Sequence, residues 1–568
     1  MTAGQVGPLT TRPTPLGRLW HRSLDRYPSN RARYVSLGIV VATTIVLYYQ
    51  LYLSGGVATS ILRGLHMSFT YYVNISVIGY LLGAAASWLA GLADRYGRAN
   101  IVTVGLAVVG LLCLVGLPNA HSELAFLILY AAIGFVEGII LVATPALIRD
   151  FSPQLGRASA MGFWTLGPVL GSLVVAAFGS GAGNRSWQDQ YRISGVIGLV
   201  VFAVALIGLR ELSPRLRDQL MVSRKDRELI EARAAGIDIE ASLRHPFRQM
   251  LRPDILLSAF AISVFLIIYY LAVGFFPVFF ESVFGYSQSR ANTLGDWFWA
   301  FDAGGLLLIG AISDRVRVRK PFMVFGAVCA IASTTIFALK ATHPATSYTT
   351  FVVLLSCIAV SLAFAFAPWM ASFTETVERR NPALIATGLA VWGLVIRIVI
   401  AVSVFFVPKI VTTATTLVQQ GPVVKAVLAD PAPVGHTTIG KVATAVSANP
   451  AVVARLQKVS SPPSAADKRF EVSAAKALGP ANLAALAHPT PALGAALKTL
   501  STDGPPVARA AADSPGQWRT FFFVGVGGEI VFIPLILLMA GFWDPRKAKR
   551  AELEHDAWLE EELRRLRA

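Results

Sequence analysis

The 568-residue chain is poor in charge: 15% of its residues are Asp, Glu, Lys or Arg, whereas 54% are hydrophobic. Soluble domains carry about 25% charged residues, so this composition indicates that lipid is the main solvent. In a soluble protein the net charge of +17 would suggest a nucleic-acid ligand. Here the basic residues cluster beside apolar runs, where they set membrane topology, and we expect no nucleic-acid partner.

Cysteine is also scarce. Cys113, Cys329 and Cys357 all lie inside apolar runs, and none has a neighbour at metal-ligand spacing. Such thiols usually pack as small hydrophobic residues, which argues against a disulfide framework and a metal site. The chain has no nucleophile–base pair and no nucleotide-binding loop, so we expect neither an enzyme nor a bound cofactor. No small-residue cleavage signal follows the first apolar run, which argues against a cleaved signal peptide.

Long apolar runs are what the sequence does contain. A hydrocarbon core about 30 Å thick requires about 20 apolar residues in a helix. Runs of this kind predict an all-α membrane protein with twelve transmembrane helices. The predicted spans are 35–53, 69–89, 101–117, 124–148, 158–178, 193–209, 255–280, 294–312, 322–339, 351–372, 383–407 and 521–542.

The loops on alternate sides of the membrane differ in basic charge. Arginine and lysine are frequent in the leader, in the even-numbered loops and after the last span, and sparse in the loops between. Because basic loops remain in the cytoplasm, this asymmetry predicts that both termini are cytoplasmic. We expect a multi-pass protein of a bacterial inner (plasma) membrane.

These signals divide the chain into a basic leader (1–34), a six-helix half (35–209), a cytoplasmic linker (210–254), a second six-helix half (255–543) and a charged helical tail (544–568). Residues 412–517 lie between the last two spans and are rich in Ala, Pro and Val. Their apolar runs are too short to cross a bilayer, and Phe470 is their only aromatic residue. This composition predicts a loosely ordered extracytoplasmic loop with short helices.

The two halves repeat each other. The second span ends in AGLADRYGRAN and the eighth in GAISDRVRVRK, so Asp94 and Asp314 are related by an offset of 220 (314 − 94). Tyr48 in IVLYYQ and Tyr269 in LIIYYL are related by an offset of 221 (269 − 48). Two unrelated motifs that share nearly the same offset indicate an internal duplication, which is common in transporters.

The loop after the second span resembles the signature of the major facilitator superfamily, G-x-L-A-D-R-x-G-R-K, with Ala90 and Ala99 at its first and last positions. The resemblance implies two pseudo-symmetric six-helix halves, a monomer in contact with lipid, and solute transport by alternating access. It also implies a gating role for the loop residues of both copies, the alternative being a basic loop that serves topology alone. These residues are Asp94, Arg95, Gly97, Arg98, Asp314 and Arg315.

Four ionisable residues lie at membrane depth, where charge is costly and therefore points to function. Glu137 and Asp302 precede the cytoplasmic edge of their spans, at Arg149 and Asp314, by the same offset (149 − 137 and 314 − 302), which is about 18 Å of helix. Arg397 is expected about 25 Å from that edge, in the outer half of the eleventh span. Glu529, in the twelfth span, is the weakest of the four.

Glu137 and Asp302 are interpreted as proton carriers, because loss of water favours the protonated form of a carboxyl group. Arg397 is either their counter-charge or an anchor for an anionic solute. In the fold that the resemblance implies, Glu137 has the best position to face the central cavity. A structural ion pair between helices would explain the same residues without any role in transport.

Aromatic residues in the spans are further candidates for contact with a solute. Adjacent helical residues point about 100° apart, so at most one of each tyrosine pair faces the cavity, and simple packing is an equal alternative. The fifth span contains a Gly-Pro pair similar to that of drug/proton antiporters, which would loosen the helix. These candidates are Tyr48, Tyr49, Tyr269, Tyr270, Trp164 and Trp392, with Gly167, Pro168 and Gly171 as the hinge.

The sequence therefore predicts a secondary active transporter of a small organic solute, with the proton as coupling ion and no other cofactor. A drug/proton antiporter and an uncoupled facilitator are the alternatives. Substrate, direction of transport and the choice between proton and sodium stay open at this stage.

Overall fold

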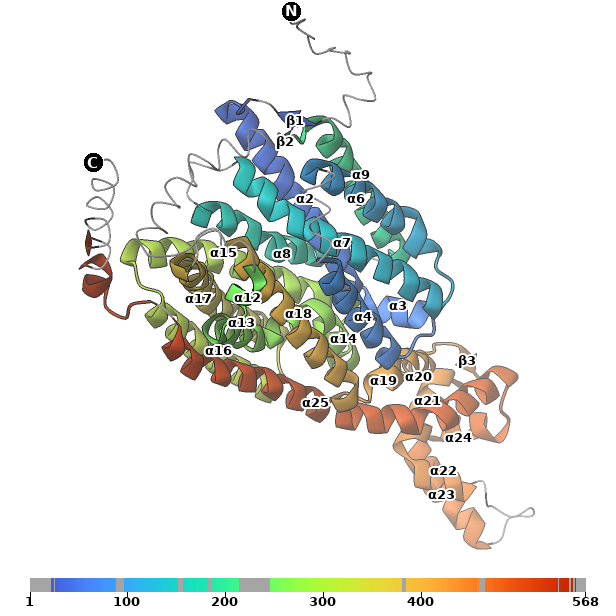
Figure 1. The fold of residues 1–568 in the computed structure, drawn as a ribbon. Helices are drawn as coiled ribbons and strands as arrows, with labels where there is room; N and C mark the ends of the chain where they lie inside the picture. The colour runs from blue at the N-terminus through green and yellow to red at the C-terminus, as the bar shows by residue number, and fades with distance from the viewer. Residues whose placement is uncertain are drawn as a thin grey trace, which may run out of the picture.

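The structure is a computed structural model in which the following residues are described: 22–24, 26–87, 97–151, 157–181, 185–213, 246–380, 385–456, 458, 465–539, 541–550, 553–554 and 557. Most of them are helical. Figure 1 shows two groups of long helices side by side, with a smaller group of short helices at one end of the bundle.

The first half begins with a short strand and ends with another. Its elements are β1 (Ser23–Leu24), α2 (Asn30–Gly56), α3 (Ala58–Gly64), α4 (Phe69–Ser87), α6 (Arg98–Leu111) with a π-helical turn (Leu112–Gly116) and a 3-10 turn (Leu117–Asn119), α7 (Glu123–Phe151), α8 (Arg157–Ser180), α9 (Trp187–Gly208) and β2 (Glu211–Leu212).

The second half repeats this order and carries the insertion before its last helix. Outside the insertion, the described elements of this half are the short α12 (Pro246–Met250), which precedes the first span, and α13 (Pro253–Phe265), α14 (Ile267–Phe284), α15 (Gln288–Val316), α16 (Lys320–Lys340), α17 (Tyr348–Arg380), α18 (Ile385–Ile410) and α25 (Pro491–Leu538). The insertion contains α19 (Ala414–Gln419), α20 (Gly421–Leu428), β3 (Pro433–Val434), β4 (Thr437–Thr438), α21 (Ile439–Ala448), α22 (Pro450–Leu456), α23 (Ala465–Leu478) and α24 (Pro480–Ala487).

A described helix lies at each of the twelve predicted spans, with α13 and α14 together at the seventh. Among the described residues, ten helical spans are long and apolar enough to cross a membrane by length and composition. Helices α8 and α15, at the fifth and eighth predicted spans, do not meet these limits over their described residues, so the structure is consistent with twelve spans. Large apolar side chains lie exposed on the bundle surface, including Val200, Ile207, Leu307 and Leu308. Exposure of such a surface to water is costly in free energy, whereas exposure to lipid is not. The surface therefore fits the prediction from composition that lipid is the main solvent.

Three helix pairs make the most extensive contacts between the described parts of the two halves. Helix α8 packs against α15, α4 against α18, and α2 against α14. Within the first half, α2 also packs against α8 and α9, and α4 against α7. We call the end of the bundle where α2 begins the linker end, and the end that carries the insertion the domain end (Figure 1).

The beginning of the described chain is tied to the end of the first half at the linker end. Strands β1 and β2 pair in parallel, and Arg22 donates a hydrogen bond of 2.6 Å to Thr103. Burial lowers the pKa of the Arg22 guanidinium from its usual value. Glu211 accepts the backbone N–H of Arg98 at 2.7 Å, so its carboxylate caps the first turn of α6.

The insertion differs from the loosely ordered loop that its composition predicted. Short helices are present as expected, but they enclose an apolar core that includes Val434, Ile439, Val442 and Leu493. Each helix is too short to be stable alone and is held by burial against its neighbours. We call residues 412–517 the inserted domain.

Helix α25 joins the inserted domain to the membrane bundle. The last span was predicted at 521–542, but the helix begins far earlier in the chain, at Pro491, and ends at Leu538. Pro505, Pro506 and Pro515 lie inside it and read as helix breakers in the sequence. They are tolerated in the part that packs against α19, α20 and α21. Most of the predicted charged tail lies outside the described residues.

Candidate functional site

Glu137 and Arg397 line one cavity in the middle of the bundle. Glu137 is the midpoint of α7, and Arg397 is close to the midpoint of α18. The cavity has about 370 Å³ of empty space, part of it open, and its walls come from α2, α4, α7 and α18. Arg397 was predicted in the outer half of its span, whereas it lies near the middle of the described helix, Ile385–Ile410.

The two charged residues in this cavity are largely without partners. Glu137 is 1% exposed, and neither of its carboxylate oxygens has a hydrogen-bond partner. Arg397 donates from Nη1 to the Gly393 carbonyl of its own helix at a long 3.4 Å. The two groups form no ion pair with each other in the described chain. The arrangement thus leaves a carboxyl group and most of a guanidinium group available to a solute, to water or to protons.

Tyr48 and Tyr49 have different neighbours. Tyr48 lies within electrostatic range of both Glu137 and Arg397, although it is not among the residues that line their cavity. The ring of Tyr49 stacks on Phe178 at 5.7 Å. That one residue of the pair faces the central cavity stays a prediction.

The predicted hinge of α8 positions Tyr48. A Cβ atom at Gly171 would lie 2.6 Å from Tyr48 Cβ, and one at Gly167 would lie 2.6 Å from Thr44 Cγ2. Glycine at these positions therefore lets α8 approach α2 closely. Pro168 lies within the helix between them.

A second cavity adjoins the first, and five of its thirteen lining residues are tyrosines. It has about 330 Å³ of empty space, and its walls include Tyr52, Tyr72, Tyr80, Tyr130 and Tyr270. Tyr80 and Tyr130 line both cavities, so the two spaces adjoin at these side chains. Sequence reasoning had not selected Tyr80, because a lone tyrosine in an apolar span reads equally well as packing or as an interface anchor.

Asp302 lies apart from Glu137 and Arg397. It is the midpoint of α15 and is 3% exposed. It lines neither cavity, and its electrostatic neighbour is Tyr269, whose ring lies 5.0 Å from that of Trp299. The structure therefore groups two of the three main candidates and places the third at a separate position.

The remaining candidates lie away from the cavities. Glu529 accepts a hydrogen bond of 2.8 Å from Thr334 and is held between α25 and α16. Trp392 packs on Trp369 with ring centroids 5.5 Å apart, within the aromatic core of the second half. The side chain of Trp164 lies outside the described part of the structure.

At the domain end, hydrogen bonds and an ion pair join the halves. Asn292 of α15 donates to the Gly56 carbonyl at 2.9 Å. Glu281 of α14 accepts from Thr59 at 2.7 Å and pairs with Arg63 at 3.3 Å. These contacts hold α14 and α15 of the second half against the end of α2 and against α3 of the first. Sequence reasoning missed them, since Arg63 appeared only as a scattered loop charge.

The signature loop of the first half is described only from Gly97. Asp94 and Arg95 lie outside the described residues. Gly97 has φ +94°, in the region that favours glycine, so the residue before α6 adopts a conformation that other residues rarely take.

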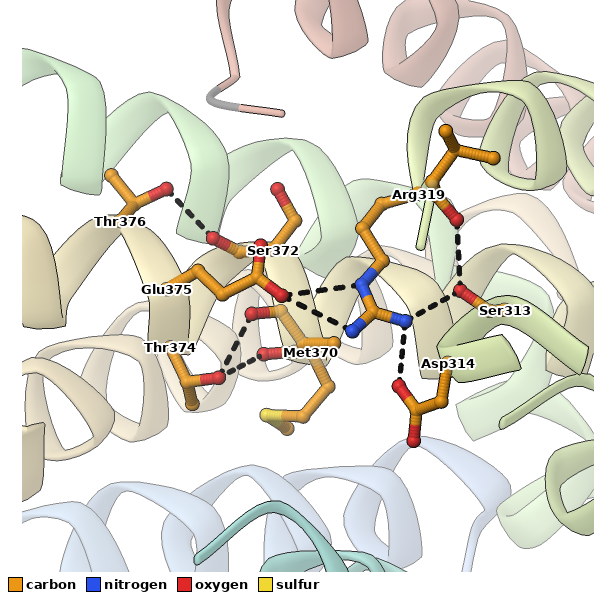
Figure 2. A network of polar contacts seen from close by, with 10 residues as sticks. Ser313, Asp314, Arg319, Met370, Ser372, Thr374, Glu375 and Thr376 are labelled. Atoms are coloured by element: carbon orange, nitrogen blue, oxygen red, sulfur yellow. Dashed lines mark hydrogen bonds and ion pairs between the residues drawn. The ribbon is translucent and has the colours of Figure 1, made fainter. Parts of the chain in front are cut away.

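The second copy forms a network of polar contacts at the linker end (Figure 2). Arg319 pairs with Asp314 at 2.7 Å and with Glu375 at 3.1 Å, and it donates to Ser313 at 2.8 Å. These residues connect α15, the start of α16 and α17 within the second half and do not bridge the halves. Arg315 was predicted to act in gating together with Asp314, but it is not part of this network in the described residues.

Residues 40–404 match the sequence profile of the Major Facilitator Superfamily. The chain is 26% identical over 271 residues to an efflux pump of Floropilus chiversii, covering 44% of this chain and 48% of the relative. It is 23% identical over 283 residues to a 3-(3-hydroxy-phenyl)propionate transporter of Escherichia coli, covering 49% and 63%. The chain thus spans about half to two thirds of the length of these curated relatives.

Two solved structures resemble the fold. A bacterial homologue of the human lysosomal transporter Spinster, inward-facing and unoccupied, has a TM-score of 0.58 and 15% identity, covering 90% of this chain and 98% of that one. A D-xylose–proton symporter has a TM-score of 0.54 and 12% identity, covering 66% and 90%. At these identities the likeness concerns the arrangement of helices.

Proposed function

This chain belongs to the Major Facilitator Superfamily, and we propose that it is a secondary active transporter that couples a small organic solute to protons by alternating access. It is a multi-pass membrane protein of a transporter family. The proposal adds three elements to this: the coupling ion, the position of the site between Glu137 and Arg397, and the direction in which the site opens.

The unpaired carboxyl group of Glu137 carries the proposal. A buried carboxylate without a hydrogen bond or ion pair is costly at membrane depth, whereas its protonated form is neutral. A carboxyl group placed in this way in a cavity takes up a proton when it is isolated and releases it when water or a cation reaches it. Glu137 has the burial and the missing partners that this cycle requires.

The contacts between the halves support a site that opens toward the linker end in this conformation. The domain end is closed by Asn292, Glu281 and their partners in the first half. Transport then requires these bonds to break as the domain end opens and the linker end closes. From the basic residues of the loops we propose that the linker end is cytoplasmic, in the plasma membrane of a bacterium.

Purified protein in liposomes with an imposed pH gradient tests the coupling. A panel of organic acids, amines and neutral metabolites is added, and internal pH is followed with a trapped dye. We expect solute-dependent proton flux in the parent and none in Glu137→Gln, which keeps the size of the side chain but cannot ionise. Glu123→Gln, in the first turn of the same helix, is the matched control and should retain the flux.

Infrared difference spectroscopy gives a second measurement that needs no known solute. A pH titration should show one protonated carboxyl band that disappears in Glu137→Gln and persists in Asp302→Asn. Solute transport without proton flux would make the protein an uncoupled facilitator. Flux that survives Glu137→Gln and is lost in Asp302→Asn would move the coupling site to α15.

Export of toxic compounds is the second candidate. It is favoured by Pro168 between two close-packed glycines in α8, and the similar efflux pump of Floropilus chiversii points the same way. A deletion strain would decide between the two directions. Sensitivity to added toxins favours export, and loss of growth on one nutrient favours uptake.

A further inference from the structure

We infer that the transported solute is a small aromatic carboxylate, bound with its carboxylate on Arg397 and its ring among the tyrosines of the adjoining cavity. The inference rests on the proposed function for the transport of this solute. The binding chemistry itself can be tested separately.

The charge inside the two cavities favours an anion. Tyrosines apart, Glu137 and Arg397 are their only ionisable lining residues in the described chain. When Glu137 is protonated, Arg397 leaves a single uncompensated positive charge at the middle of the membrane. A positive charge at this depth is costly unless an anion accompanies it.

The hydrogen-bonding capacity of Arg397 favours a carboxylate in particular. A guanidinium group has five N–H donors in a planar fork that fits the two oxygens of a carboxylate. One donor of Arg397 makes a long bond to Gly393, and the group makes no other hydrogen bond or ion pair in the described chain. The remaining donors are available for a ligand in the cavity that Arg397 lines.

The adjoining cavity favours an aromatic ring on the same solute. Tyr52, Tyr80 and Tyr270 line it, and Tyr80 also borders the cavity of Arg397. The hydroxyl groups of Tyr80 and Tyr270 have no hydrogen-bond partner among the described residues. A ring that enters this space gains edge or face contacts with the tyrosines, and a polar substituent on it would find a hydroxyl partner.

The position of Glu137 connects this binding to the proton. An ionised Glu137 in the same cavity offsets the positive charge of Arg397 and repels an anionic solute. A protonated, neutral Glu137 does neither. The solute and the proton therefore favour the same state of the site, which is the requirement for symport.

Calorimetry on the full chain in lipid nanodiscs tests the inference with probes of matched shape. Phenylacetate, phenethyl alcohol and phenethylamine differ in charge, and cyclohexylacetate lacks only the aromatic system. We expect phenylacetate to bind about tenfold to a hundredfold more tightly than the alcohol, since an ion pair with the Arg397 guanidinium replaces a hydrogen bond to a neutral hydroxyl. The amine should not bind. Cyclohexylacetate should bind more weakly by about threefold.

Variants then assign the contacts. Arg397→Gln should remove the preference for phenylacetate over the alcohol, and Arg397→Lys should keep part of it. Lys409→Gln is the matched control, because Lys409 lies at the end of the same helix over Phe405 and Phe406. Tyr80→Leu should abolish the difference between phenylacetate and cyclohexylacetate, whereas Tyr80→Phe should retain it.

The outcomes separate this inference from the proposed function. Binding of phenethylamine in preference to phenylacetate, binding of none of the four probes, or equal behaviour of Arg397→Gln and Lys409→Gln would overturn it. Equal binding of phenylacetate and cyclohexylacetate would overturn the aromatic part and leave the carboxylate. Proton-coupled transport of an amine would refute the inference and preserve the proposed function. Tight binding of phenylacetate without proton flux would support the binding chemistry and refute the proposed coupling to protons.

Discussion

Asn292 offers a direct test of how the two halves are held closed. It is 3% exposed, and its Nδ2 donates to the Gly56 carbonyl across the interface at 2.9 Å. When the domain end opens, water satisfies both groups, so Asn292→Ala should destabilise only the closed state. Loss of the bond and the unpaired carbonyl that remains together cost about 1 to 2 kcal/mol.

A cost of this size should raise the ratio of open to closed molecules about tenfold. Distances between spin labels at His121 and His343 would report it, since both residues are exposed at the domain end, one in each half. The labels require cysteines at these positions and serine at the three native cysteines. A new population at longer distance is expected in the variant.

The matched control is Asn119→Ala. Asn119 is exposed at the same end and donates only within the first half, to the Val115 carbonyl at 2.8 Å. It should leave the distance distribution of the parent unchanged. Identical distributions for both asparagine variants would show that the Asn292 bond does not hold the domain end closed, and would refute the reasoning.

Two other perturbations concern the linker end. Gly97→Ala should destabilise the protein by about 1 to 3 kcal/mol, because φ is +94° and a Cβ atom would lie 2.5 Å from Glu211 Oε1. The melting temperature of the variant in detergent should therefore fall. An unchanged melting temperature would show that the turn relaxes freely. Arg319→Gln removes the ion pairs to Asp314 and Glu375, but these carboxylates are 62% and 40% exposed, so a loss of only about 1 kcal/mol is expected in the same assay. A fall as large as that of a core mutation would contradict that estimate.

The transmembrane part of the fold could be predicted because its signal is local. An apolar run of the required length specifies a helix regardless of what it packs against, and a described helix lies at each of the twelve predicted spans. The inserted domain could not be predicted in this way. Val434 and Leu493 meet in its core, although each belongs to a segment too short and too weakly apolar to identify alone.

The sequence identified the individual candidate residues of the site, but not which of them line the same cavity. Glu137 and Asp302 look equivalent in the sequence, since each is a lone carboxyl group at the same depth of its span. Only the packing of α4 against both α7 and α18 brings Arg397, from the other half of the chain, into the cavity of Glu137 and leaves Asp302 elsewhere. The depth of a residue in the membrane follows from its distance along the helix. The direction in which its side chain points depends on how that helix packs against its neighbours.

Helix α25 has 48 residues and is therefore about 72 Å long, of which a membrane accounts for about 30 Å. The part beyond the membrane, roughly 40 Å by the same geometry, is an arm continuous with the last helix of the second half. A small tilt of α25 would be magnified at the far end of the inserted domain, in proportion to the length of the arm. A fluorophore placed there would turn each cycle of the carrier into a displacement that can be followed on single molecules from outside the bilayer.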